Sequence, residues 1–203
     1  MAKGRPRSFV RDQALKRATM VFWKHGYDAT SVAHLTEAMG IGAPSMYAAF
    51  GDKRALFEEA LVYYMKTYGS FMARLFDGRF EEQSVRAAIA QLLRDAATMF
   101  TSSDHPRGCM LITAATNCAP ESATVAKRLR ELRASTVEAL EARISGAIAR
   151  GELPADVDAR ALALYVSTVL QGLSAQARDG ATRADLEAIV ETAMRAWPRP
   201  RKM

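Results

Sequence analysis

The 203-residue sequence contains little of what characterises several large classes of protein. It has two cysteines, so a fold held together by disulfide bonds is not expected. Its 12 glycines and 7 prolines are far too few for collagen or for a low-complexity fibre. No run approaches the roughly 18 apolar residues of a membrane span, and no apolar run follows the basic residues 1–7, so we expect neither a membrane segment nor a secretory signal. Since 49% of the residues are hydrophobic, we expect a folded protein of the cytoplasm.

The sequence also lacks the motifs of common enzyme classes. There is no nucleophile elbow, no glycine-rich phosphate loop and no pair of histidines spaced to bind a metal from one helix. We therefore expect no catalytic residues, no cofactor and no metal site, although turnover of a bound metabolite would revive an enzymatic hypothesis. A helical adaptor whose basic ends touch a membrane is a further alternative, which the inward-facing apolar stripes disfavour.

The positive charge of the chain is concentrated at its ends. The net charge is +6, from 28 basic and 22 acidic residues. Residues 1–57 carry +5, residues 58–198 carry −2 and residues 199–203 carry +3. This asymmetry favours an N-terminal module that binds a polyanion, joined to a segment with another role. Basic termini that only aid solubility are the alternative.

Apolar residues recur at helical spacing almost throughout, and no stretch alternates with the period of a β-strand. Glycine, proline and capping residues divide the chain into about nine helices, which predicts an all-α fold. The expected helices span residues 9–25, 31–39, 44–50, 53–77, 82–100, 109–119, 120–150, 159–173 and 182–197. The expected N-caps are Thr30 or Ser31, Asp52, Asp156 or Asp158, and Thr182.

Residues 31–50 have the layout of a helix-turn-helix motif. Two short helices flank a glycine turn, and spaced apolar residues would anchor both. In such a motif the second helix enters the DNA major groove. The residues expected on its exposed face are small, so base recognition would rest on Ser45, Tyr47, contact with thymine methyl groups, or neighbouring elements. A structural αα-hairpin within a helical bundle is the alternative.

Groups suited to DNA phosphates surround this motif. Tyr47, Lys53 and the N-terminus of the helix that begins at Lys53 are well placed to bind the DNA backbone. The basic arm of residues 3–7 suits a narrow minor groove, where arginine senses an enhanced negative potential. The candidate DNA-binding residues are Lys3, Arg5, Arg7, Thr30, Ser31, Pro44, Ser45, Tyr47 and Lys53.

The N-terminal part of the chain resembles the TetR/AcrR-type transcriptional regulators. The matches, between residues 9 and 62, are Ala14, Ala18, Phe22, Gly26-Tyr27, Thr30-Ser31-Val32, Leu35, Gly40-Ile41, Ser45-Met46-Tyr47, Phe50, Lys53 and Ala55-Leu56. The chain departs from many members at Ala43-Pro44, where they have a basic residue and a glycine, so no phosphate contact is expected from Ala43.

This resemblance implies two domains and a function. Residues 1–57 would form a three-helix DNA-binding domain, with the helix-turn-helix motif at residues 31–50. Residues 58–203 would form a larger helical domain that dimerises and binds a small-molecule effector. The protein would then be a homodimeric repressor that binds a palindromic operator in double-stranded DNA and is released by the effector.

Patterning near the C-terminus supports the dimer. Residues 159–173 are apolar on nearly every side, and residues 182–197 carry one apolar stripe. Two such helices from each of two chains would make a four-helix interface, whereas in a monomer they would form an internal core. The candidate interface residues are Tyr165, Val169, Gly172, Leu173, Ile189, Met194 and Trp197.

The effector site is expected on the inner faces of the central helices. The candidate residues are Tyr68, Met72, Phe76, Met99, Phe100, Cys109, Met110, Thr113 and Asn117. Apolar residues at this spacing also fit a plain core. Thr113 and Asn117 are polar within an apolar segment, so each needs a partner, which would be a ligand or a backbone carbonyl.

Cys109 gives rise to an alternative hypothesis. Arg107 and a neighbouring helix N-terminus would favour a reactive thiolate, so the protein would be a redox- or electrophile-sensing repressor that acts through Cys109. On one helix, Cys118 would be too far away to form a disulfide with it. A buried, inert cysteine is the simpler interpretation.

Overall fold

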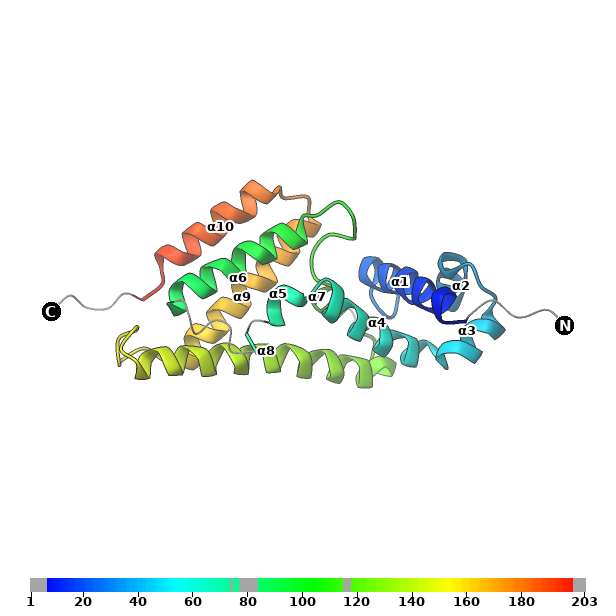
Figure 1. The fold of residues 1–203 in the computed structure, drawn as a ribbon, viewed down its shortest axis with the longest axis horizontal. Coiled ribbons are helices and arrows are strands. Elements are labelled where there is room, and N and C mark those ends of the chain that lie inside the picture. Colours follow the sequence, from blue (N-terminus) through cyan, green and yellow to red (C-terminus); the bar gives the residue numbers. More distant parts are fainter. Residues whose placement is uncertain (1–6, 74, 77–83, 115–117, 199–203) are drawn as a thin grey trace. The chain divides into compact units, whose positions relative to one another are not determined.

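We describe residues 7–73, 75–76, 84–114 and 118–198 of a computed structural model. They form ten α-helices and one 3-10 helix, with no β-strand among them (Figure 1). The all-α fold predicted from the sequence is thereby confirmed. Contacts between residues divide the chain into two compact units, Met1–Tyr68 with Cys109–Leu129, and Gly69–Gly108 with Arg130–Met203. The domain boundary expected after residue 57 stays a prediction.

The first unit is centred on four helices. They are α1 Arg7–His25, α2 Val32–Met39, α3 Ala43–Phe50 and α4 Lys53–Thr67. α1 packs against α2 and α4, and α3 contacts the same two helices (Figure 1). Aromatic rings fill the space between α1 and α4: Trp23 meets Tyr64 edge to face at 4.7 Å, and Phe22 meets Phe57 at 5.0 Å. These buried ring pairs make α1 a firm brace for the two short helices.

Arg11 ties the N-terminal half of α1 to α3 and α4. Its guanidinium donates two hydrogen bonds to the carboxylate of Glu59, at 2.7 and 2.8 Å. It also donates to the carbonyl of Ala49 at 3.3 Å and lies 4.5 Å from the centre of the Phe50 ring. Because the planar side chain of Arg11 contacts both α3 and α4, it fixes the end of α3 against α1 and α4.

Three later segments complete the first unit. They are α7 Met110–Thr113, the 3-10 helix η1 Pro120–Ser122, and the first turns of α8 Ala123–Ala149. α7 packs on α1 and α4. Asp28, which follows α1, accepts hydrogen bonds from the Ala119 amide at 2.7 Å and from the Ser122 hydroxyl. Arg128 pairs with Glu58 at 3.4 Å. The start of α8 is therefore fastened both to the turn after α1 and to α4.

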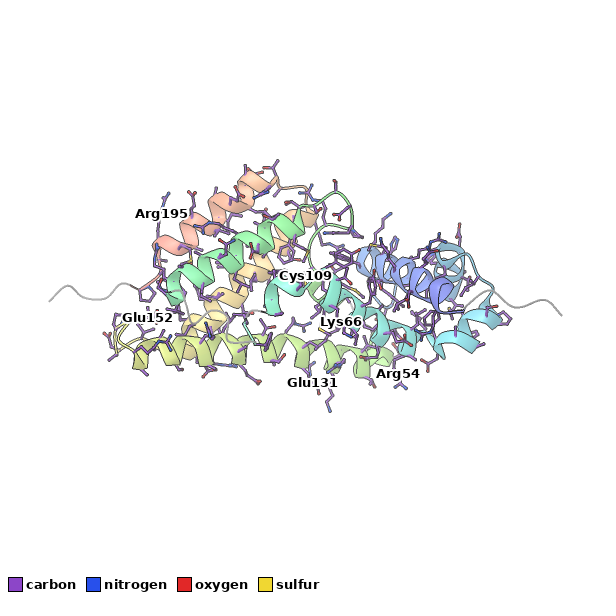
Figure 2. The ribbon with its side chains drawn as sticks, in the orientation of Figure 1. Arg54, Lys66, Cys109, Glu131, Glu152 and Arg195 are labelled. Atoms are coloured by element: carbon purple, nitrogen blue, oxygen red, sulfur yellow. The ribbon has the colours of Figure 1, made fainter. Side chains whose placement is uncertain are left out.

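The second unit is built on a packed group of helices. It contains α5 Ser70–Ala73, α6 Val85–Phe100, the remainder of α8, α9 Ala159–Arg178 and α10 Arg183–Arg195. α6 packs against α9 and α10, which also contact each other. The predicted N-caps Asp158 and Thr182 are confirmed, and Thr182 forms a capping box with Asp185. Glu152, just beyond α8 (Figure 2), accepts a hydrogen bond of 2.7 Å from the Val85 amide and so fixes the start of α6. Among the described residues, none of the helices combines the length and the apolar character that a membrane span requires.

Two of the expected helices end much earlier than predicted. The helix predicted over 53–77 is α4 alone, which ends at Thr67, and α5 follows as a separate short helix. The segment predicted as a helix over 109–119 is helical, among its described residues, only at Met110–Thr113. Both errors fall where the chain passes from one unit to the other. Helical periodicity continues across these points, so the local pattern gave no signal for the breaks.

Gly108 stands at one of these crossings, directly before the chain enters α7. Its φ is +78°, and its amide donates to the Phe100 carbonyl at 2.9 Å. A Cβ at this position would lie 2.8 Å from the Ser174 carbonyl oxygen and 2.9 Å from Cγ of Arg178. The neighbouring Arg107 donates to the carbonyl of Ala181. The segment before α7 is therefore held tightly against α9 and the turn that precedes α10, at a site that only glycine fits.

Candidate DNA-binding interface

α2, a glycine turn and α3 form the helix-turn-helix predicted for residues 31–50. Gly40 ends α2 in the left-handed conformation, with φ +68°, and its amide donates to the carbonyls of Thr36 and Glu37. Pro44 occupies the first turn of α3, where its missing N–H leaves no bond unmade. Met46 and Phe50 are buried and anchor one face of α3 in the core of the first unit. The glycine turn and these two buried side chains orient α3 so that its opposite face is exposed to solvent.

The exposed face of α3 carries few polar groups. Pro44, Ser45, Ala48 and Ala49 are all exposed, and Tyr47 is the largest side chain on the helix surface, at 49% exposure. Small side chains allow a helix to lie deep in a groove, and a tyrosine hydroxyl at its edge reaches a phosphate or a base. Pro44, Ser45 and Tyr47, all predicted to bind DNA, are therefore brought together on one exposed surface.

Two cations stand at the first turn of α4. Lys53 follows the N-cap Asp52, and its ammonium lies 4.3 Å from the centre of the Tyr27 ring. Partial burial lowers the pKa of Lys53, which the nearby Asp28 carboxylate partly opposes. Arg54 is exposed beside it (Figure 2). Because the free N–H groups of a helix N-terminus already attract anions, this turn is suited to a phosphate. Arg54 was not among the predicted site residues, although its place directly after Lys53 at the helix start was a usable signal.

Ser31 and Thr30 have different roles in the structure. Ser31 is exposed and caps α2, since its hydroxyl accepts from the His34 amide at 3.1 Å. His34 completes the capping box by accepting from the Ser31 amide at 3.4 Å, a role that sequence reasoning missed because glutamate or glutamine is usual there. Thr30 is fully buried and donates to the Gly26 carbonyl at 2.6 Å. Thr30 is thus a packing residue and does not belong to the exposed surface.

The basic arm is described only in part. Lys3 and Arg5 lie outside the described residues, and Arg7 is the first residue of α1. A contact of this arm with a minor groove stays a prediction.

The predicted effector residues are divided between the two units. Tyr68, Cys109, Met110 and Thr113 belong to the first unit, and Met72, Phe76, Met99 and Phe100 belong to the second. Met110 and Phe100 are buried, whereas Phe76 is 59% exposed. The hydroxyl oxygen of Thr113 is buried and has no hydrogen-bond partner among the described residues. Asn117 lies outside the described residues, and a shared pocket stays a prediction.

Cys109 lies beside a buried tyrosine. It precedes α7 (Figure 2), and its sulfur accepts a hydrogen bond of 3.4 Å from the hydroxyl of Tyr64. Burial raises the pKa of Tyr64 well above its usual value, so this hydroxyl keeps its proton and remains a donor. Cys109 and Cys118 are not joined in a disulfide bond, and both are of intermediate exposure. Reactivity of Cys109 toward oxidants or electrophiles stays a prediction.

The predicted dimer residues separate into surface and core. Tyr165 and Ile189 are exposed at 36% and 38%, Gly172 is exposed and Val169 is half-buried. The Tyr165 hydroxyl donates to the Ala193 carbonyl at 3.1 Å and so joins α9 to α10. Leu164, which sequence reasoning did not include, is 47% exposed on the same helix. The other three predicted residues are buried within the chain itself, and they are Leu173, Met194 and Trp197.

Metal ligands do not gather in the described part of the chain. No three histidine, cysteine, aspartate or glutamate side chains there are placed to hold a metal ion. His25 and His34 lie with their ring centres 6.2 Å apart. Burial, followed by the charges of Lys24 and His34, lowers the pKa of His25.

Comparison with known proteins gives two family matches that together cover most of the described chain. Residues 14–60 match bacterial regulatory proteins of the tetR family, and residues 85–193 match the tetracyclin repressor-like C-terminal domain. The chain belongs to the TetR family. The first match contains the whole helix-turn-helix, and the second extends from the start of α6 into α10. The resemblance seen in residues 9–62 is therefore confirmed and now extends to the second unit.

Individual members of the TetR family resemble the chain along nearly its whole length. The HTH-type transcriptional repressor ComR of Escherichia coli K12 is 39% identical over 97% of this chain and 93% of that protein. The repressor BdcR of the same organism is 33% identical over 87% of this chain and 83% of that protein. The regulator CifR has a solved structure, in which a cysteine mutant is complexed with 26-base-pair operator DNA. CifR is 46% identical to this chain, and the two structures match with a TM-score of 0.88. The match covers 96% of this chain and all of the CifR chain.

Proposed function

We propose that the protein is a transcriptional repressor that binds a palindromic operator as a homodimer and releases it when a small molecule binds its C-terminal helices. The observation that carries this proposal is the exposed face of α3, the second helix of a helix-turn-helix. Ser45 and Tyr47 are exposed there, and the next helix along the chain begins with Lys53. Its relatives ComR and BdcR are named as repressors, and CifR is seen with operator DNA. A regulator of this kind works in the cytoplasm and needs no catalytic residue.

The homodimer is supported by the surface of α9 and α10. Leu164, Tyr165 and Ile189 are large apolar side chains left exposed on two helices that contact each other. Gly172 lies on α9 with Leu164 and Tyr165, and beyond its own stretch of helix no atom of the described residues lies within 4 Å of the position its Cβ would take. A second copy would cover this apolar surface, and its helices would approach closely at the glycine.

Replacing Gly172 with arginine is expected to weaken the dimer at least about tenfold, which corresponds to about 1.4 kcal/mol. The side chain has room in one protomer and improves helix propensity, but it would stand between two copies. Sedimentation equilibrium would measure the dissociation constant, with Ala87→Arg on the exposed side of α6 as the matched control. An unchanged dimer in Gly172→Arg would place the interface elsewhere.

An effector site is supported by the buried hydroxyl of Thr113, which has no hydrogen-bond partner among the described residues. Most buried polar groups in proteins have a partner, so a polar group of a bound molecule is a reasonable partner here. Helix α7, which carries Thr113, packs on α1 and α4. A ligand that prefers one arrangement of these helices would shift the position of the helix-turn-helix and change its affinity for DNA.

Lys53→Gln is expected to weaken DNA binding about tenfold for every operator sequence, because it removes a phosphate contact. The slope of the logarithm of the binding constant against the logarithm of the salt concentration is expected to fall by about one for each protomer. Fluorescence anisotropy at several salt concentrations would measure both quantities. Lys66→Gln, in the last turn of the same helix (Figure 2), is the matched control. Equal losses in the two variants would show that only net charge matters and that Lys53 makes no particular contact.

A further inference from the structure

We infer that α3 recognises its operator mainly through the C5-methyl groups of thymine, with little hydrogen-bonded recognition of bases. This inference rests on the proposed function and specifies what its recognition helix detects in the major groove. It follows from the positions of the residues around the helix axis and from the residue types that α3 lacks.

The part of α3 that would lie deepest in a groove is apolar. Successive residues turn by about 100° around a helix, so Pro44 and Ala48 lie in one line on the side opposite the buried Met46 and Phe50. Both Pro44 and Ala48 are exposed. The centre of the exposed face is therefore formed by a proline ring and an alanine methyl.

The flanks of this apolar line carry the polar groups of the helix. Ser45 lies on one side of the line and Tyr47 on the other, and both are exposed. The helix contains no arginine, lysine, asparagine or glutamine, which are the side chains that make paired hydrogen bonds to guanine or adenine. The long cations next to it, Lys53 and Arg54, stand at the start of α4, where phosphates are the expected partners.

An apolar helix face favours one feature of the major groove. Of the four bases only thymine presents a methyl group there, and alanine is a common partner of this methyl. Removing a methyl from water stabilises a complex, whereas an apolar face set against the amino or carbonyl groups of the other bases would leave them without hydrogen-bond partners. We therefore expect thymines on either strand at the base pairs beneath Pro44 and Ala48.

The test replaces thymine with deoxyuridine, which lacks only the methyl group. A duplex would be selected from a random pool with the purified full-length protein, and each thymine would be replaced in both half-sites at once. Replacing a thymine that lies under α3 with deoxyuridine is expected to weaken binding about fourfold for each methyl group lost. Replacing the equivalent thymines of both half-sites is therefore expected to weaken binding about 15-fold. Thymines outside the α3 contact are the internal control, and their replacement should leave affinity unchanged.

Two further measurements make the test specific to α3. Changing the sensitive T·A pairs to C·G should weaken binding, and 5-methylcytosine at the same positions should recover part of the loss. Ala48→Gly removes the protein methyl, so this variant should respond less to deoxyuridine than the natural protein does. If affinity were the same for thymine and deoxyuridine throughout the operator, the inference would be overturned while DNA binding stood. If no duplex were selected at all, the proposed function itself would fail.

Discussion

Raising the salt concentration from 50 to 200 mM is expected to weaken operator binding about a thousandfold or more. Two protomers each present Lys53 and Arg54 at the start of α4, and these two cations are part of the net charge of +5 that residues 1–57 carry. Each cation that neutralises a phosphate releases counterions, and six to ten such contacts give a loss of about 10³–10⁵ over this range. An anisotropy titration of labelled operator at graded salt concentrations would give the slope directly.

A nearly flat salt dependence would contradict the role assigned to the basic N-terminal unit. The dimer must stay intact across the series, so its dissociation constant would be measured under the same conditions. If the slope were steep for random DNA and shallow for the selected operator, phosphate contacts would contribute to non-specific binding only.

Gly108→Ala is expected to lower the free energy of unfolding by about 3 kcal/mol. A non-glycine residue at this left-handed φ costs about 1–2 kcal/mol, and overpacking against a fixed neighbour costs about 1–3 kcal/mol more. Here the added Cβ would lie 2.8 Å from the Ser174 carbonyl oxygen, so the backbone itself would have to move. Urea unfolding followed by circular dichroism, at a fixed protein concentration, would measure the change.

Gly151→Ala is the matched control for this variant. Gly151 has a φ of +76°, close to the +78° of Gly108, but among the described residues no atom beyond its chain neighbours lies within 4 Å of its Cβ position. Only the conformational cost applies there, and we expect a loss of about 1 kcal/mol. Equal losses at the two glycines would show that the segment before α7 yields easily and is not held against α9.

Local signals in the sequence were sufficient to predict the helix-turn-helix. Two of these signals, the glycine turn and Pro44 in the first turn of α3, are present in the structure. The same holds for the N-caps of three other helices, which are Asp52, Asp158 and Thr182. Each signal acts within a few residues. Capping and turn preferences arise from neighbouring atoms of the same segment, which explains why they can be recognised without the fold.

Features that depend on distant parts of the chain could not be predicted in this way. Helical periodicity alone did not predict where α4 and α7 end, and Gly108 is confined by residues more than sixty positions away. In the sequence, Thr30 and Ser31 were equally good candidates for binding DNA. In the structure only Ser31 is exposed, whereas Thr30 is buried and its hydroxyl donates to the carbonyl of Gly26. Neither long-range burial nor the choice between adjacent hydroxyls is encoded in a local pattern.

Selection of bound duplexes from a random DNA pool is the measurement that tests the central claim most directly. The account predicts a palindrome whose half-site centres are about one helical turn apart, because two α3 helices of a symmetric dimer enter successive major grooves. The stoichiometry on the selected duplex should be two protomers for each palindrome or a multiple of that. Failure to enrich any sequence, or enrichment of a single asymmetric site that one protomer occupies, would contradict the account.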